Sequence, residues 1–423
     1  MTAVHLSYGR HGLDVPLLGA DPLVVLPRDA PALDDPAAAI TAALRDPIGC
    51  APLREQLTGV RRIAVSVCDG TRAQPRPVML AGILDELAAA GCAAEVTVLV
   101  ATGSHRGNTD AELREMLGPV RDRVRVVNHD ARDRDTLTHL GVRGAGVDVW
   151  INSEWVDADL RITTGFVEPH FFAGFSGGPK MVTPGLAGID TIMTLHDAHR
   201  IGDPAATWGP VEDNPVHRDI RACAAACPPH LALDVLLDRR KRITHVYAGE
   251  LFAMHAAASG TALEVAMRPV PDLFDVVVTT GSGYPLDQNL YQAVKGMAAA
   301  ERVVRPGGTV VIAAECADGL PAHGSFAEVL GAASSPAALL ELIGSPGFAV
   351  PDQWQVQVLA RVLSRARVEL FCAGLPADEV RAAHLTPVAD VGAAVARALE
   401  RHGPGARVCY LPEGPQTIPY VIR

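Results

Sequence analysis

The sequence predicts an α/β fold made of two α/β domains with mainly parallel sheets. Short β-branched runs alternate with alanine- and leucine-rich helical stretches, which is the pattern of a layered parallel sheet. The chain has 423 residues, more than one hydrophobic core usually holds, so two domains are expected. Ligands of paired α/β domains commonly bind between them, and we therefore expect an active-site cleft there.

The N-terminal half contains three apolar runs that predict buried parallel strands, each followed by a polar loop. They lie at 62–72 (RIAVSVCDGTR), 94–107 (AEVTVLVATGSHRG) and 157–170 (DADLRITTGFVEPH). The stretch at 77–91 (PVMLAGILDELAAAG) predicts a helix between the first two runs. Because the carboxyl ends of parallel strands meet at one edge of a sheet, the three polar loops should converge.

The C-terminal half repeats this pattern after a break. Residues 255–272 change from helix-forming to proline-punctuated, which predicts a boundary that separates domain 1–268 from domain 269–423. Beyond it we predict a strand at 275–288, a helix at 289–304, and further strands at 307–316, 367–374 and 406–414. These elements make a second, smaller α/β domain.

Composition and charge exclude several classes of protein. A content of 48% hydrophobic and 20% charged residues is typical of a folded globular chain. The formal net charge of -11 argues against a nucleic-acid partner, which requires a cationic face. The N-terminus lacks the features of a secretory signal, and no run is long enough to span a bilayer. Eight cysteines without CxxC pairs fit reduced thiols. We therefore expect a cytoplasmic protein with neither a nucleic-acid nor a membrane partner.

The polar loops at the predicted strand ends carry candidate acid, base and anion-binding groups. His105 and His170 each follow a predicted strand, and an imidazole accepts or donates a proton near neutral pH. Asp69, Thr71 and Arg72 supply a carboxylate, a hydroxyl and a guanidinium, and the guanidinium suits a substrate carboxylate or a phosphate. Taken singly, each histidine is better explained by a structural role, and an internal pair of Asp69 with Arg72 is the simpler alternative.

The segment 168–180 (EPHFFAGFSGGPK) brings three glycines, a serine and a lysine into one loop. It is not a Walker A loop, because Lys180 is followed by Met181 and Pro179 lacks an amide donor. The residues GFSGG at 174–178 present consecutive amides and a hydroxyl, which suit one phosphate. A plain tight turn is an equal alternative.

Two GxG fragments, at 144–146 and 281–283, lack the third glycine of a dinucleotide-binding motif. They give little support to NAD binding.

Two further clusters are candidates for ligand binding. His196 and His199 lie three residues apart and on one helix would share a face, so both could approach one metal. No third protein ligand lies nearby, and a solvated helix end is the alternative. In the C-terminal half, four polar side chains at helical spacings would line one helix face: Gln288, Tyr291, Gln292 and Lys295.

Together these motifs resemble the nickel-pincer lactate racemases and their homologues. The matching blocks run through most of the chain: DGTR at 69–72, GSHR at 103–106, EPHFFAGFSGGPK at 168–180, LHDAH at 195–199, GYPLDQNLYQAVKGM at 283–297 and PDQW at 351–354. Six blocks in register are far more specific than any one of them. The resemblance implies an isomerase, a racemase or epimerase that acts on a 2-hydroxy acid such as lactate.

The resemblance also implies a cofactor. Lys180 looks like the lysine that carries the nickel-pincer nucleotide, a nickel complex of pyridinium-3,5-bisthiocarboxylic acid mononucleotide, through a thioamide. The nickel is held by two sulfurs and a ring carbon, and His196 matches the histidine that completes the square plane. The remaining cofactor contacts implied are Asp69, Thr71, Ser176, Gly177 and Gly178.

The same resemblance implies roles for the residues that handle the substrate. His105 and His170 match two acid/base residues. One takes the hydroxyl proton while the α-hydrogen moves as hydride to the cofactor, and return from the other face inverts the centre. The residues that would anchor the carboxylate, polarise the carbonyl and wall the pocket are Arg72, Tyr291, Gln292, Lys295 and Trp354. Domain 1–268 would then bind the cofactor and catalyse, domain 269–423 would contribute substrate contacts, and cofactor-making enzymes are the implied partners.

Two other functions compete with the racemase. An NAD-dependent 2-hydroxyacid oxidoreductase keeps the fold, but the GxG fragments support it weakly. A non-catalytic carrier of nickel or of the cofactor accounts for the histidine-rich loops but gives no reason for His105 and His170. The sequence does not identify which 2-hydroxy acid would be the substrate.

Overall fold

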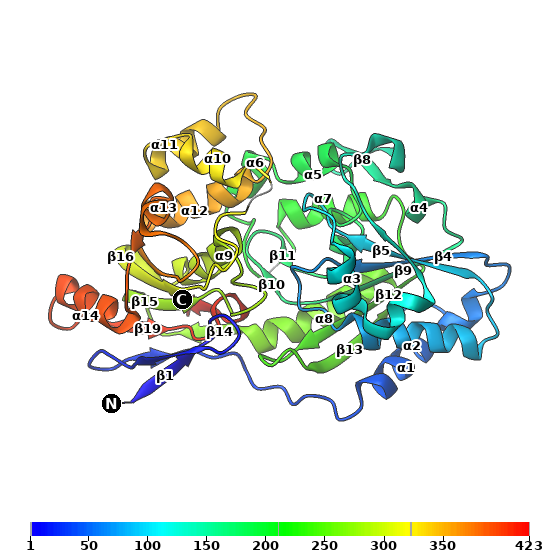
Figure 1. Ribbon diagram of the computed structural model, residues 1–423, viewed down its shortest axis with the longest axis horizontal. Helices are drawn as coiled ribbons and strands as arrows, with labels where there is room; N and C mark the ends of the chain where they lie inside the picture. The colour runs from blue at the N-terminus through cyan, green and yellow to red at the C-terminus, as the bar shows by residue number, and fades with distance from the viewer. Residues whose placement is uncertain (1, 210, 322–323, 423) are drawn as a thin grey trace. The chain divides into compact units, whose positions relative to one another are not determined.

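The computed structural model describes residues 2–209, 211–321 and 324–422 (Figure 1). The chain divides into two compact units. The N-terminal unit comprises Asp29–His196 and Pro204–Glu264, and the C-terminal unit comprises Met1–Arg28, Asp197–Asp203 and Val265–Arg423. Each unit contains a six-stranded, mainly parallel sheet together with helices, which confirms the predicted fold class.

The N-terminal unit is built on a sheet with strand order β13-β12-β9-β4-β5-β6. β12 and β13 are antiparallel, and the other neighbours are parallel. The strands are β4 (Arg62–Cys68), β5 (Glu95–Ala101), β6 (Arg125–Asn128), β9 (Leu160–Phe166), β12 (Leu231–Leu237) and β13 (Ile243–Gly249). Two hairpins stand outside this sheet, β7 (Leu137–Arg143) with β8 (Val147–Asn152) and β10 (Pro169–His170) with β11 (Gly174–Phe175).

The three predicted N-terminal strands are present as β4, β5 and β9, and the predicted helix is α2 (Arg76–Ala89). β4 pairs in parallel with both β5 and β9, so the carboxyl ends of all three lie at one edge of the sheet. β4 and β9 are buried along almost their whole length, as a parallel sheet covered on both faces requires.

Helices complete the N-terminal unit. They are α1 (Pro36–Arg45), α2, α3 (Asp110–Leu117), α4 (Ser153–Val156), α5 (Ile189–Leu195), α7 (Pro215–Ala224) and α8 (Leu251–Ala266, of which the residues up to Glu264 belong to this unit), with 3-10 turns η1 (Leu53–Gln56), η2 (Gly118–Arg123), η3 (Arg134–Thr136) and η4 (Gly178–Met181). Figure 1 shows α1 and α2 side by side. Their apolar faces join the core with the strands through Ile40, Leu44, Met79 and Ile83, and this burial is the main force that holds them there.

The C-terminal unit has a parallel sheet with strand order β18-β17-β16-β15-β19-β3. Its strands are β3 (Leu23–Val24), β15 (Phe274–Thr280), β16 (Val304–Ala313), β17 (Arg367–Phe371), β18 (Thr386–Pro387) and β19 (Val408–Tyr410). Two further strand pairs are β1 (Ala3–Leu6) with β2 (Leu13–Pro16) and β14 (Met267–Val270) with β20 (Ile418–Val421). Its helices are α6 (Ala198–Gly202), α9 (Leu290–Glu301), α10 (Phe326–Gly331), α11 (Pro336–Ile343), α12 (Gln353–Arg365), α13 (Ala377–Ala382) and α14 (Val391–His402), with the 3-10 turn η5 (Gly414–Gln416). The predicted strands and helix of this half correspond to β15, α9, β16, β17 and β19.

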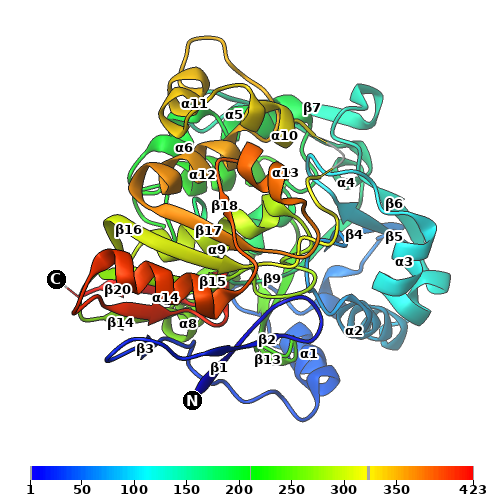
Figure 2. The same cartoon turned by 60° about the vertical axis from the view of Figure 1, so that its left-hand side comes forward.

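The N-terminal hairpin belongs to the core of the C-terminal unit. Leu6 of β1 and Val15 of β2 are buried in one cluster with Val278 of β15 and Val395 of α14. Figure 2 shows the hairpin, in blue, near α14, in red. Residues at the start of the chain therefore pack with elements from its end.

The two compact units of the structure do not have the same residue ranges as the two predicted domains. The two units change over between Glu264 and Val265, near the predicted position 268/269, but Met1–Arg28 and Asp197–Asp203 group with the C-terminal unit. Pairing of β3 with β19 explains why the first residues do so. The division into domains 1–268 and 269–423 stays a prediction. Within the described residues, no helix is both long and apolar enough to cross a membrane.

Candidate active site

The DGTR loop follows β4 and is held in place by one buried arginine. The Arg76 guanidinium donates from Nε to the carbonyl of Cys68 (2.8 Å) and from Nη2 to the carbonyls of Arg72 (2.9 Å) and Asp69. A fixed guanidinium fork suits several carbonyl acceptors at once. The loop is therefore ordered by its own helix start, since Arg76 is the first residue of α2.

A chain of hydrogen bonds joins the predicted polar residues of this loop to His105. Arg72 Nη1 donates to Thr71 Oγ1 (2.8 Å), and Thr71 Oγ1 donates to Asp69 Oδ1 (2.6 Å). The other carboxylate oxygen, Asp69 Oδ2, lies 2.7 Å from His105 Nδ1. β4 and β5 are parallel neighbours, which is why loops 36 residues apart in sequence meet here.

The Asp69 carboxylate is ionised and fixes the tautomer of His105. Burial raises the pKa of Asp69, but the charge and hydrogen bond of His105, with Arg72 and Thr71, outweigh burial and hold that pKa well below its usual range. An ionised carboxylate only accepts, so His105 Nδ1 carries a proton. When the His105 ring is neutral, its lone pair lies on Nε2, and Nε2 is then the atom at which this form accepts a proton.

His170 lies at the end of the short strand β10, in the hairpin with β11. Its Nδ1 accepts a hydrogen bond from the backbone N–H of Ala173 at 3.4 Å. Nδ1 therefore holds the lone pair, and Nε2 of the neutral ring carries the proton. The two predicted acid/base histidines thus have opposite tautomers.

Phe172 connects three predicted site residues. Its buried ring meets the His170 ring edge-on at 4.5 Å between centroids and the His196 ring edge-on at 5.3 Å. The Lys180 amine lies 5.6 Å from the centre of the same phenyl ring. One aromatic side chain therefore lies beside a candidate acid/base residue, a candidate metal ligand and the candidate attachment lysine.

Lys180 lies in η4, directly after the glycine turn. Burial and, to a smaller extent, the positive charge of Arg72 together lower the pKa of its amine to about 7. A substantial fraction of the amine is therefore uncharged near neutral pH, which is the nucleophilic form.

His196 follows α5 and is buried. Its Nδ1 lies 2.8 Å from the carbonyl of Ile192, which only accepts, so Nδ1 carries the proton and the lone pair is on Nε2. Burial lowers the pKa of His196 to about 3, and the charge of Lys180 contributes to this. A neutral imidazole with its second nitrogen anchored to a carbonyl is the usual form of a metal-ligating histidine.

The expectation that His196 and His199 share one helix face is wrong. α5 ends at Leu195 and a new helix, α6, begins at Ala198. Asp197 caps α6 by accepting from the N–H of Arg200, so the two histidines do not belong to one continuous helix. His196 belongs to the N-terminal unit and His199 to the C-terminal unit.

The glycine turn uses most of its polar groups internally. The Ser176 hydroxyl donates to the carbonyl of Phe166 (2.9 Å) and accepts from the N–H of Glu168 (3.0 Å). Its single proton is therefore committed within the loop, which weakens the expectation that Ser176 donates to a phosphate. Gly177 and Gly178 have φ of 70° and 48°, a backbone region that favours glycine.

The predicted substrate residues of the C-terminal unit lie together at α9 and α12. Trp354 Nε1 donates to the Tyr291 hydroxyl (2.9 Å), and Lys295 Nζ donates to Gln292 Oε1 (2.7 Å). Gln288 does not share their helix face, because it precedes α9, which begins at Leu290.

Neither GxG fragment is placed as a dinucleotide-binding motif requires. Residues 144–146 form the turn between the antiparallel strands β7 and β8. Residues 281–283 follow β15 but are separated by a loop from α9. A dinucleotide motif needs a glycine turn that opens a helix directly. Within residues 2–209, 211–321 and 324–422, no group of three or more His, Cys, Asp or Glu side chains is arranged to hold a metal ion.

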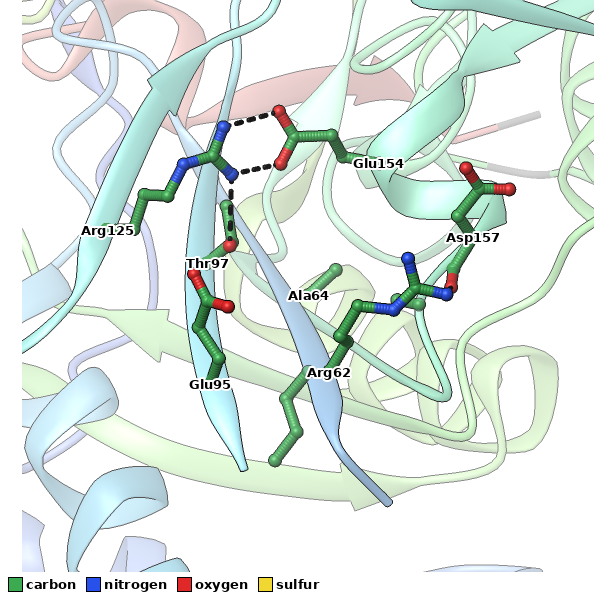
Figure 3. Close-up of a pocket in the computed structure, with 9 residues that line it drawn as sticks. Arg62, Ala64, Glu95, Thr97, Arg125, Glu154 and Asp157 are labelled. Atoms are coloured by element: carbon green, nitrogen blue, oxygen red, sulfur yellow. Dashed lines mark hydrogen bonds and ion pairs between the residues drawn. The ribbon is translucent and has the colours of Figure 1, made fainter. Parts of the chain in front are cut away.

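A separate hollow of about 120 Å³ lies at the opposite end of the N-terminal sheet, where β4, β5 and β6 begin (Figure 3). Two of its charged side chains pair with each other, since Arg125 forms a two-pronged ion pair with Glu154, and Arg62 Nη2 donates to the backbone carbonyl of Asp157 (2.6 Å). Since ligands of open parallel sheets bind at the carboxyl ends, this hollow is not the candidate active site.

Comparison with known proteins identifies the family. A family model described as the lactate racemase N-terminal domain matches residues 8–209, and one described as the lactate racemase C-terminal domain matches residues 271–418. The lactate racemase of Thermoanaerobacterium thermosaccharolyticum is 35% identical over 382 residues, which cover 90% of this chain and 89% of that protein. The chain belongs to the lactate racemase family.

Other relatives agree with this assignment. The lactate racemase of Lactiplantibacillus plantarum is 34% identical over 377 residues, 89% of each protein. The structure of the lactate racemase apoprotein from T. thermosaccharolyticum matches with a TM-score of 0.91 at 32% identity, over 99% of this chain and 100% of that chain. A Thermotoga maritima protein, at a TM-score of 0.71 and 18% identity over 94% of this chain and 100% of that one, shares the fold. The racemase is therefore an isomerase that acts on a small molecule, as its motifs predicted.

Three residues that support the site were not predicted from sequence. Arg76 orders the DGTR loop, and Asp234 and His255 contact the glycine turn. One signal was available for Asp234, which is the only charged residue in the apolar run LALDVLL of β12. A lone carboxylate in a buried strand is an informative exception to the rule that charges lie outside.

Proposed function

We propose that the racemase interconverts the enantiomers of a 2-hydroxy acid such as lactate, with His105 and His170 as its two acid/base residues. The observation that carries this proposal is the hydrogen bond of 2.7 Å between His105 Nδ1 and Asp69 Oδ2, which leaves Nε2 as the atom at which a neutral His105 accepts a proton. Inversion through a 2-keto acid needs a group that takes the hydroxyl proton of one enantiomer and a group that returns a proton to the other.

His105 would act as the base in the first direction. Its Nε2 accepts the hydroxyl proton, and the ionised Asp69 stabilises the imidazolium that results. His170 would donate to the carbonyl oxygen of the keto acid from its imidazolium form, so that it returns to a neutral ring. His105 is then the imidazolium and His170 the neutral base, and this exchange of protonation states readies the enzyme for the opposite enantiomer.

The residues around Lys180 fit a covalently attached nickel-pincer nucleotide. The Lys180 amine is in substantial part neutral near pH 7, His196 presents a neutral imidazole, and the Trp208 indole N–H and His217 Nδ1 are buried without a protein partner. Lys180 would carry the cofactor and His196 would supply the protein ligand to nickel. When bound, such a group provides the acceptor for the α-hydrogen, which leaves the substrate as hydride.

The substrate would be oriented by charge and hydrogen bonds from this chain. Arg72 is fixed by Thr71 and offers a guanidinium suited to the carboxylate. Lys295 and Gln292 would polarise the forming carbonyl, while Tyr291 and Trp354 would bound the pocket. Asp69, Thr71, Gly177 and Gly178 remain candidate cofactor contacts. We further propose that the racemase works in the cytoplasm, where cofactor-making enzymes would load it.

The decisive experiment is co-expression with the cofactor-making enzymes, followed by intact-protein mass spectrometry, nickel analysis and chiral chromatography over a panel of 2-hydroxy acids. We expect added mass on Lys180, bound nickel and inversion of at least one acid. His105→Ala and His170→Ala should abolish inversion while the added mass stays. A racemase that inverts substrate with an unmodified Lys180 peptide and no nickel would contradict the cofactor assignment.

A further inference from the structure

Two buried side chains form hydrogen bonds with the backbone of the glycine turn, Ser176–Gly178, which precedes Lys180. Asp234 Oδ2 accepts a hydrogen bond from the N–H of Gly178 at 2.6 Å. His255 Nε2 lies 2.9 Å from the carbonyl of Ser176, which only accepts, so His255 is the donor. The two contacts hold the peptide groups on either side of Gly177, one by its N–H and one by its carbonyl.

The space for these two side chains exists because the neighbouring residues are glycines. A Cβ at Gly177 would lie 2.6 Å from Asp234 Oδ2, and a Cβ at Gly165 would lie 2.8 Å from Asp234 Oδ1. A Cβ at Gly178 would lie 2.4 Å from the His255 ring. All three distances are shorter than any normal contact, so a side chain at these positions would displace the carboxylate or the imidazole.

The contacting groups are themselves fixed. Asp234 is fully buried on β12, and its pairing with Gly165 of β9 ties it to the central sheet. His255 is buried on α8, and the His217 ring stacks on it at 5.8 Å between centroids. The turn is therefore anchored to two separate elements, a strand and a helix, that do not themselves carry any predicted site residue.

We propose that Asp234 and His255 are positioning residues. They set the geometry of the Ser176–Gly178 turn and thereby fix the position of the Lys180 backbone. η4 begins at Gly178, and the N–H of Lys180 donates to the carbonyl of Gly177 (3.0 Å), so the turn determines where the lysine backbone lies. The role of these residues in cofactor attachment rests on the proposed function of Lys180. The two hydrogen bonds from Asp234 and His255 to the turn are present in the chain without cofactor.

The test compares substitutions that remove a hydrogen-bonding group with substitutions that keep it. Asp234→Leu and His255→Phe remove the acceptor and the donor at similar shape, whereas Asp234→Asn and His255→Gln retain them. In each variant, hydrogen exchange of residues 176–180 is measured on the unloaded chain by mass spectrometry. After co-expression with the cofactor-making enzymes, the loaded fraction is then measured by intact mass.

We expect the Leu and Phe variants to exchange these amides about tenfold faster, the effect of losing one hydrogen bond, and to load about tenfold less cofactor. The Asn and Gln variants should stay within about twofold of the unaltered protein in both measurements. Amide hydrogen exchange in α2 serves as the internal control. It should stay unchanged if the substitution loosens only the turn and should rise if the whole chain is destabilised. If one of the Leu and Phe variants does not fold, the other gives the same comparison.

Unchanged exchange in folded Leu and Phe variants would overturn the inference. Faster hydrogen exchange with an undiminished cofactor-loaded fraction would overturn the positioning role, because the geometry of the turn would then not be needed for attachment at Lys180. If the unaltered protein gains no mass at Lys180, the proposed cofactor attachment is wrong. The hydrogen-exchange measurement still decides whether Asp234 and His255 hold the turn.

Discussion

Asp69 illustrates how one residue combines two tasks. Its Oδ1 accepts from the Thr71 hydroxyl and holds the DGTR loop, while its Oδ2 accepts from His105 Nδ1 and fixes a tautomer. Only the second task depends on the ionised carboxylate, because an amide oxygen in place of Oδ1 still accepts from Thr71. A substitution that keeps the shape and removes the charge therefore separates them.

Asp69→Asn should lower kcat by roughly 10²- to 10⁴-fold, which is the usual contribution of a positioned general acid or base. An amide presents N–H donors to Nδ1, which moves the imidazole proton to Nε2 and removes the base. Rates of inversion are measured by chiral chromatography in both directions, with cofactor loading checked by intact mass. A variant that loads normally and keeps its rate would contradict this role of Asp69.

Lys180 should show a reactivity that depends on pH in a defined direction. Because burial and Arg72 lower its pKa to about 7, the amine is mostly charged and inert below that pH and mostly neutral and reactive above it. Acetylation of Lys180 in the unloaded chain should therefore be half-maximal near pH 7. The chain has three lysines, so Lys241 and Lys295 serve as internal comparisons in one peptide map.

A substitution at Arg72 provides the control for this lysine. Arg72→Gln removes the second cause of the lowered pKa, so the midpoint for Lys180 should move to higher pH. A midpoint at the ordinary lysine value of about 10.4 in the unaltered protein would show that the amine is solvated.

At the scale of elements, the site depends on where strands end and on what orders the loops after them. The DGTR loop is held by a residue of the helix that follows it, and the glycine turn is held by β12 and α8. Loops ordered in this way keep catalytic groups in place without binding energy from the substrate. Loss of the ordering side chain should therefore reduce both stability and activity.

Arg76→Met should lower the free energy of unfolding by about 2–4 kcal/mol, because several buried carbonyls lose their donors. The activity should fall as well, since the loop carries Asp69, Thr71 and Arg72. Urea denaturation followed by circular dichroism measures the first effect. Arg123→Met, which removes an exposed partner of Asp85, should change stability by less than about 1 kcal/mol.

At the scale of the whole molecule, one buried acid makes stability depend on pH. Burial raises the pKa of Asp234 to about 7, although the hydrogen bond from Gly178 lowers it. The folded chain thus binds a proton that the unfolded chain has released above its ordinary pKa of about 3.9. The contribution of this proton is complete below pH ~3.9 and is lost as the pH rises through about 7.

Asp234→Asn should therefore gain stability relative to the unaltered protein as the pH rises from 5 to 8, by roughly 2 kcal/mol. The amide cannot ionise and does not pay this penalty. Urea denaturation at the two pH values measures the difference, with the exposed Asp85→Asn as the matched control. An unchanged difference between the two pH values would mean that Asp234 is solvated or otherwise compensated.

Much of the architecture was accessible from the sequence. β4, β5, β9, β15 and β16 coincide with apolar runs, because a strand buried on both faces requires nearly continuous β-branched and aliphatic residues. The edge at which His105 and Asp69 meet followed from parallel pairing alone. The motifs also gave the family, which the comparisons confirmed.

Tertiary structure decided the rest, because hydrogen bonds between distant residues depend on register and packing that no local pattern encodes. The sequence alone did not show that Ser176 uses its hydroxyl within the loop, or that α5 stops between His196 and His199. Nor did it show that Asp234 and His255 form hydrogen bonds with the turn before Lys180, since these residues lie 56 and 79 residues from their partners in sequence. The sequence by itself determined the strands, their shared edge and the reactive residue types, whereas protonation states and positions arose only once burial and neighbouring charges were fixed.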